Sequence, residues 1–113
     1  MQLITNISIT DRASKVLRDQ RARFKPRVVG EVFALFYSPT FTNADGTTVA
    51  GFRPGYMVGS QAPLGLGDHW ALARLPDRSE FLFMPKFKPA SDVGRIMDLA
   101  SETFPIFSIG QVR

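Results

Sequence analysis

The chain has 113 residues, which is room for one domain, 1–113, built around one hydrophobic core. Its 44% hydrophobic and 21% charged residues are typical of a folded protein and argue against disorder. Cysteine is absent, which excludes disulfides, thiolate metal sites, iron–sulfur ligation and cysteine nucleophiles. Because His69 is the only histidine, a zinc site would rest on one imidazole, and we expect neither a metal nor a cofactor.

The formal net charge is +4, and its distribution matters more than its size. Between Asp11 and Arg27 lie seven basic residues and two acidic ones, so the basic character belongs to one element. No apolar run approaches the roughly 20 residues that span a bilayer. The first residues also lack the basic start and apolar core of a secretory signal. We therefore expect a cytoplasmic protein that does not bind membranes.

The chain begins with a pattern typical of a strand followed by a helix. Residues 3–9 alternate loosely and are rich in β-branched types, which predicts a strand. Thr10 is a suitable N-cap, and Asp11 suits the first turn of a helix. The apolar stripe of this helix comprises Ala13, Val16, Leu17, Gln20 and Phe24. Pro26 should end it near Phe24, giving an amphipathic helix of about 14 residues.

A hairpin is predicted over residues 28–60. Residues 28–41 form the longest β-rich run, and 43–46 supply turn chemistry, with Gly46 free to adopt a positive φ. The return strand within 47–60 is interrupted by Pro54 and Gly55, which is typical of a bulge or an edge position. The Pro- and Gly-containing residues that follow, 61–68, are predicted to form a surface loop.

A second hairpin is predicted over residues 69–87, with Pro76–Ser79 as its loop. A loop of that length pairs Arg74 with Phe81, Leu72 with Phe83 and Trp70 with Pro85. One face then carries Trp70, Leu72, Phe81, Phe83 and Phe87, and the other carries Ala71, Ala73, Leu75, Leu82 and Met84. Both faces are apolar, which is typical of strands that are covered on both sides.

A second helix is predicted to start at Pro89 or Ser91 and to end before Pro105. Its apolar stripe would comprise Val93, Ile96, Met97 and Ala100, widened by Leu99. Residues 104–109 are predicted to form a last strand. The order β-α-β-β-β-β-α-β indicates an α+β domain, with two helices packed on a curled, mostly antiparallel sheet of about five or six strands.

The apolar second face of the 69–87 hairpin needs a cover if both helices pack on one side of the sheet. Large apolar patches are rare on monomers, so we expect a homodimer formed through this face. A barrel-like curl of the sheet is the competing explanation.

The basic helix is the first candidate site. We expect residues 11–25 to bind an acidic or anionic partner through Arg12, Lys15, Arg18, Arg21, Arg23 and Lys25. The alternative is that the helix exposes charges of one sign to solvent and binds nothing. Clustered Lys and Arg also bind phosphate backbones, so a nucleic-acid-binding module that uses this helix is a second hypothesis.

The Gly-rich loop 61–69 is the second candidate site, belonging to a small enzyme or ligand-binding protein. An unperturbed imidazole has a pKa near neutrality, so His69, the single histidine, would be the acid–base group of this site, with Ser38, Ser60 or Ser79 as candidate nucleophiles. Asp68 is badly placed to orient His69, because neighbouring side chains of a strand point to opposite faces. Trp70 stands where a dinucleotide-binding loop needs its third glycine. We therefore place a non-enzymatic interaction protein first.

Overall fold

The computed structural model describes residues 2–40, 42–48, 50, 54–62, 67–87, 94–101 and 105–111. Its elements in chain order are β1 (Gln2–Ile4), β2 (Ile7–Ile9), α1 (Asp11–Arg23), β3 (Val32–Ser38), β4 (Gly55–Gln61), β5 (Ala71–Arg74), β6 (Glu80–Phe83), β7 (Arg95–Ser101) and β8 (Ile106–Gln111). The strands form one sheet in the order β1-β5-β6-β3-β4-β8-β7-β2. No helix in the described part of the chain has the length and apolarity needed to cross a membrane.

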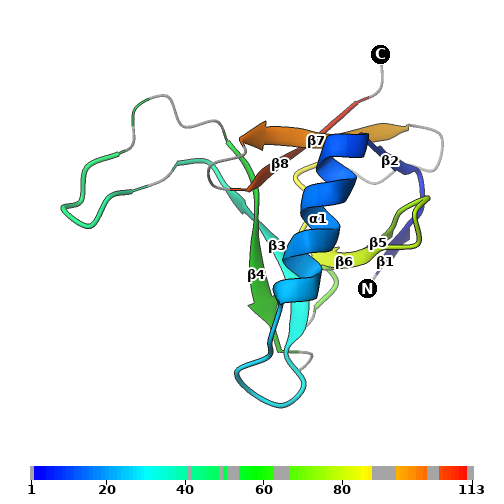
Figure 1. The fold of residues 1–113 in the computed structure, drawn as a ribbon, viewed down its shortest axis with the longest axis horizontal. Helices are drawn as coiled ribbons and strands as arrows, with labels where there is room; N and C mark the ends of the chain where they lie inside the picture. Colours follow the sequence, from blue (N-terminus) through cyan, green and yellow to red (C-terminus); the bar gives the residue numbers. More distant parts are fainter. Residues whose placement is uncertain are drawn as a thin grey trace.

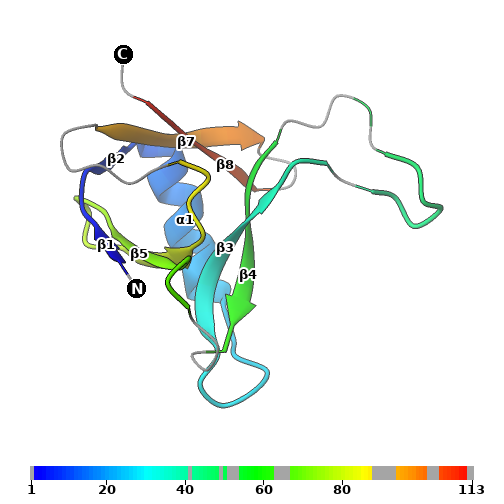
Figure 2. The same ribbon diagram turned by 180° about the vertical axis from the view of Figure 1, so that it is seen from behind.

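The sheet curls into a nearly closed barrel (Figures 1 and 2). Its two end strands, β1 and β2, follow each other in the chain and are separated only by Thr5 and Asn6. β1 pairs in parallel with β5, and β2 pairs in parallel with β7. The predicted fold class is therefore wrong, because the described residues form eight strands and one helix. The expected single first strand divides at Thr5 and Asn6 and supplies both ends of the sheet.

The predicted first helix is confirmed as α1. The hydroxyl of Thr10 accepts a hydrogen bond from the Ala13 amide at 3.3 Å, as an N-cap should, and Phe24 is the C-cap, two residues before Pro26. Ala13 and Leu17 are buried in the main core cluster, which includes Phe81, Phe83, Met97 and Phe107 from the sheet. α1 thus fills the concave side of the barrel (Figure 1).

The predicted second helix is wrong, because residues 95–101 form strand β7. Met97 and Leu99 are buried while Ile96 is 38% exposed, which is the period of two expected for a strand. β7 is hydrogen-bonded to β2 on one side and to β8 on the other, and two ladders outweigh a helical spacing of apolar residues. Val93, part of the expected stripe, lies outside the described residues.

Both predicted hairpins are present, but the register of the second was predicted wrongly. β3 and β4 form an antiparallel ladder in which Val32 pairs with Gln61 at one end and Ser38 pairs with Gly55 at the other. In the other hairpin, Ala71 pairs with Phe83 and Ala73 with Phe81. The cause is Arg78, whose φ of 71° extends the loop to five residues, closed by a 2.9 Å hydrogen bond from the Leu75 amide to the Ser79 carbonyl.

This shift by one residue exchanges the partners on the two faces of the β5–β6 hairpin. Phe81 and Phe83 share the concave face with the two alanines of β5, not with Trp70 and Leu72. On the convex face, Leu82 and Trp70 are buried with Ala34, and the Trp70 ring meets Phe36 edge-to-face at 5.8 Å. The curl and these rings cover much of the second face, so the apolar surplus that motivated a homodimer is reduced. Self-association itself stays a prediction.

Candidate binding cleft at the end of the helix

Arg12 is held in a structural ion pair between α1 and β7. Its Nε and Nη2 donate to the two carboxylate oxygens of Asp98 at 2.8 and 2.9 Å. The Thr10 hydroxyl donates to the same carboxylate at 2.7 Å. These bonds, that of Arg12 first, hold the pKa of Asp98 well below its usual range. Among the predicted binding residues, Arg12 therefore has a clear structural partner.

Arg21 is engaged with the sheet. Its guanidinium donates to the carbonyl of Glu80 and lies 5.6 Å from the centre of the Phe33 ring. Such a cation–π contact and hydrogen bond tie the helix to β6 and β3. Arg21 is not among the residues that line the cavity at the end of α1.

Lys15 and Arg18 line a broad cavity of about 830 Å³ on the exposed side of α1. The residues around it are Arg12, Lys15, Val16, Arg18, Asp19 and Leu99. Five of these six belong to the helix, so the cavity presents one helix face with little enclosure from the sheet. This surface is part of the predicted basic helix, and on it the cations Arg12, Lys15 and Arg18 accompany one carboxylate, that of Asp19.

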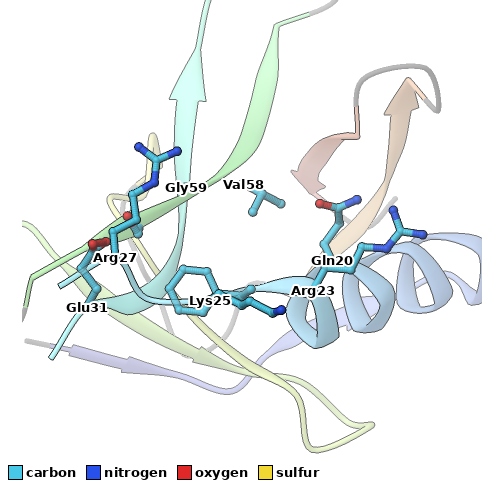
Figure 3. A pocket seen from close by; sticks show the side chains of 9 residues that line it. Gln20, Arg23, Lys25, Arg27, Glu31, Val58 and Gly59 are labelled. Atoms are coloured by element: carbon cyan, nitrogen blue, oxygen red, sulfur yellow. The ribbon is translucent and has the colours of Figure 1, made fainter. Parts of the chain in front are cut away.

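The last two predicted residues, Arg23 and Lys25, lie at a separate cavity of about 430 Å³, which we call the basic cleft. It is lined by Gln20, Arg23, Phe24, Lys25, Arg27, Glu31, Val58, Gly59 and Ser60. Arg23 and Gln20 project from the last turns of α1, with Arg27 and Glu31 on the opposite side and Val58 between them (Figure 3). The cleft thus joins three segments: the helix end, the α1–β3 connection and β4.

Positive charge prevails around the basic cleft. Three cations face one carboxylate, that of Glu31. Arg23 pairs with Asp19 at 3.4 Å, but both side chains are mostly exposed, so the pair is weak and easily exchanged. Lys25 and Arg27 form no ion pair with any residue that the structure describes. Their positive charge is available to a ligand.

Apolar groups accompany these cations. The Phe24 ring is half-buried and meets Phe33 edge-to-face at 5.8 Å, and Val58 packs against the core beside it. Next to the cleft, Val28 is 65% exposed and Val29 is fully exposed on a turn. That turn is closed by a 3.2 Å hydrogen bond from the Glu31 amide to the Val28 carbonyl and has Gly30 at φ 89°. Apolar and cationic groups are therefore both accessible at this end of the molecule.

Sequence reasoning missed part of this site. Arg27 was counted among the basic residues but lies beyond the helix, and no local pattern indicated that Val58–Ser60 would lie beside it. The one usable signal was the continuation of basic residues past Pro26.

His69 lies in different surroundings. It is exposed, at the edge of a small cavity of about 160 Å³ shared with Asp68, Trp70 and Pro85, and it forms no hydrogen bond with a described residue. Ser60 lines the basic cleft, and the amide of Ser79 bonds to Asp77 in the β5–β6 turn. Residues 63–66 of the Gly-rich loop lie outside the described part of the chain. Within that part, no group of three or more His, Cys, Asp or Glu is placed to hold a metal ion.

The chain matches no protein-family model, no curated protein and no solved structure. Fold and cleft together define a small barrel-like β domain with helix α1 in its concavity and a basic cleft at the end of that helix. Function is therefore inferred from the chemistry of the cleft.

Proposed function

We propose that this protein is a small non-enzymatic interaction protein that binds an acidic partner through the basic cleft. The observation that supports this proposal is the convergence of Arg23, Lys25 and Arg27 around one cavity with an apolar floor. Cations at the rim attract carboxylates, while Phe24 and Val58 offer apolar contact inside. The proposed setting is the cytoplasm, where a chain without cysteine is unaffected by reducing conditions.

An acidic protein segment suits this cleft better than a nucleic acid does. Binding of single strands usually relies on aromatic rings on which bases stack. Among the described residues that line the cleft, Phe24 is the one aromatic side chain, and it is half-buried and already packed against Phe33. The nucleic-acid-binding module remains the alternative, because the same three cations would attract a phosphate backbone.

The test is a binding titration with a fluorescein-labelled peptide of alternating Glu and Val. We expect weak binding to wild type that Lys25→Glu weakens about five- to tenfold, since one charge reversal removes an attraction and adds a repulsion. Lys15→Glu is the matched control, because it makes the same change on the exposed helix face outside the cleft. We expect it to weaken binding less than twofold at physiological salt, where screening is strong.

Three results would contradict the proposal. Equal losses in the two variants would assign binding to the helix face and not to the cleft. No binding of the peptide would remove the support for an acidic protein partner. Tighter binding of a single-stranded oligonucleotide, with a steep dependence on salt, would favour the nucleic-acid alternative.

A further inference from the structure

We propose that a second cavity, which we call the aromatic cavity, binds a small molecule that carries both an aromatic ring and an anionic group. Its volume is about 540 Å³, within the range of roughly 300–1,000 Å³ that is typical of small-molecule sites. Its described lining includes three aromatic rings, Tyr37, Tyr56 and Phe87, and two cations, Lys86 and Arg95. No described residue lines both this cavity and the basic cleft, so the inference is independent of the proposed function.

The aromatic cavity lies at the start of β4, beside the point where the β4–β8 ladder begins. Pro54 and Gly55, which precede the paired residues of β4, and residues 108–110, which follow the paired residues of β8, line it. The basic cleft is lined by Val58–Ser60, further along β4. Figure 1 shows the start of β4 next to β8 and its end near the α1–β3 connection. The two cavities are therefore separate sites.

Both cations of the aromatic cavity lie over aromatic rings. The Cζ atom of Arg95 lies 3.9 Å from the centre of the Phe87 ring, and the Nζ atom of Lys86 lies 5.7 Å from the centre of the Tyr37 ring. A guanidinium group that lies over a ring keeps its N–H groups in its own plane, where they can bind a carboxylate or a phosphate in a bidentate manner. We therefore expect Arg95 to be the main contact of the anionic group.

The carboxylate of Asp98 also belongs to the described lining, but other groups already bind it. Arg12 donates to both of its oxygens at 2.8 and 2.9 Å, and the Thr10 hydroxyl donates at 2.7 Å. The charge of Asp98 is thus balanced by Arg12. Lys86 and Arg95 leave the described lining with an excess of positive charge, which favours an anionic ligand.

The rings of the cavity offer a surface for an aromatic ligand. Tyr37 is 37% exposed, and its ring meets that of the buried Tyr56 edge-to-face at 5.4 Å. The Tyr56 hydroxyl accepts a hydrogen bond from the Lys86 amide at 3.1 Å, which holds the segment with Lys86 and Phe87 beside β4. A ligand ring can pack against Tyr37 while its anionic group reaches Arg95. An aliphatic anion would leave the rings without contact, and an uncharged ring would leave the cations without contact.

The test is a titration of the full chain with indoleacetate and, separately, with adenosine monophosphate, followed by amide chemical shifts in NMR. Both probes join an aromatic ring to a negative charge, and they distinguish a carboxylate from a phosphate as the anionic group. Indole and acetate, each titrated alone, are the matched controls for the ring and the charge. We expect saturable binding of at least one probe, with shifts at Tyr37, Phe87 and Arg95, and binding at least tenfold weaker for both fragments.

Variants locate the bound probe. Arg95→Gln should weaken its binding about five- to tenfold, because it removes a charge-assisted hydrogen bond. Arg74→Gln is the matched control, since it makes the same change at an exposed residue outside the described lining of the cavity, and it should weaken binding less than twofold. Tyr37→Leu should weaken binding about threefold, because it keeps apolar bulk but removes the ring. Should Arg95→Gln fail to fold, Lys86→Gln at an exposed position takes its place.

Several outcomes would overturn the inference. They are no binding of either probe at millimolar concentration, equal binding of indole and indoleacetate, and equal losses in Arg95→Gln and Arg74→Gln. Lys25→Glu in the basic cleft should change the binding of the probe less than twofold. A loss in Lys25→Glu as large as that in Arg95→Gln would place the probe in the basic cleft and would also refute the aromatic cavity. The proposed function is tested separately, by the peptide titration at the basic cleft.

Discussion

Gly55, the first residue of β4, is a position at which one added methyl group should disturb the barrel. A Cβ atom there would lie 2.5 Å from Cγ2 of Ile106 and 2.8 Å from the carbonyl oxygen of Phe107. The Ile106 side chain is buried, and the Phe107 oxygen belongs to the backbone of β8, so β4 and β8 would have to separate. Overpacking of this kind destabilises proteins by about 1–3 kcal/mol.

We expect Gly55→Ala to fall in the upper part of that range, about 2–3 kcal/mol, because one of the two atoms in the way, the Phe107 oxygen, belongs to the backbone and cannot move without its strand. The melting temperature should then fall by roughly 10 °C for a chain of this size. Urea unfolding and thermal melts followed by circular dichroism measure both quantities.

Gly110→Ala is the matched control, since a Cβ at this position in β8 would have no atom within 4 Å. It should leave the free energy of unfolding within about 0.5 kcal/mol of wild type. A Gly55→Ala protein as stable as the control would refute the close approach of β4 to β8.

Two further predictions concern stability. Asp98→Asn should lower the free energy of unfolding by about 1–2 kcal/mol near neutral pH, because it weakens the bonds from Arg12 and Thr10. The lowered pKa of Asp98 means that wild type loses this contribution as the pH falls below about 4, so the difference between the two proteins in urea unfolding should shrink toward pH 2; a constant difference would contradict it. Tyr56→Phe should cost about 1–2 kcal/mol, because the buried Tyr56 hydroxyl accepts the Lys86 amide at 3.1 Å. Burial raises the pKa of Tyr56, so wild type alone should lose part of that advantage above about pH 10, as thermal melts at increasing pH would show.

Local signals predicted α1 well. Thr10 supplies the N-cap and Pro26 removes a donor just beyond the C-cap, and both effects act within a few residues. Residues 95–101 carried no such signal. Their apolar residues fit a helical stripe through Ile96, Met97 and Ala100 as well as a strand face through Met97 and Leu99, and only the neighbours β2 and β8 decide between the two.

The pairing register of β5 and β6 could not be predicted from the sequence for a related reason. The loop of the β5–β6 hairpin depends on Arg78 at a positive φ, a conformation that usually belongs to glycine. Nothing in the Leu75–Ser79 sequence marks Arg78 for that role. A loop assigned one residue too short then placed Phe81 and Phe83 beside the wrong partners.

The candidate site, too, was predictable from the sequence only in part. The run of basic residues from Arg12 to Arg27 is visible in the sequence, because charge is a property of each residue. Which of these cations are engaged is a property of their neighbours: Asp98 lies 86 positions from Arg12 and Glu80 lies 59 positions from Arg21.

By itself, the sequence determined one amphipathic basic helix and two hairpins, because capping, turn chemistry and apolar spacing act over a few residues. The tertiary structure decided that a single two-residue break at Thr5 and Asn6 supplies both ends of a curled sheet, and that β4 lies beside the end of α1. Both depend on strand pairing between distant segments. Such pairing is selected by the packing of the whole core, which no short stretch of sequence encodes.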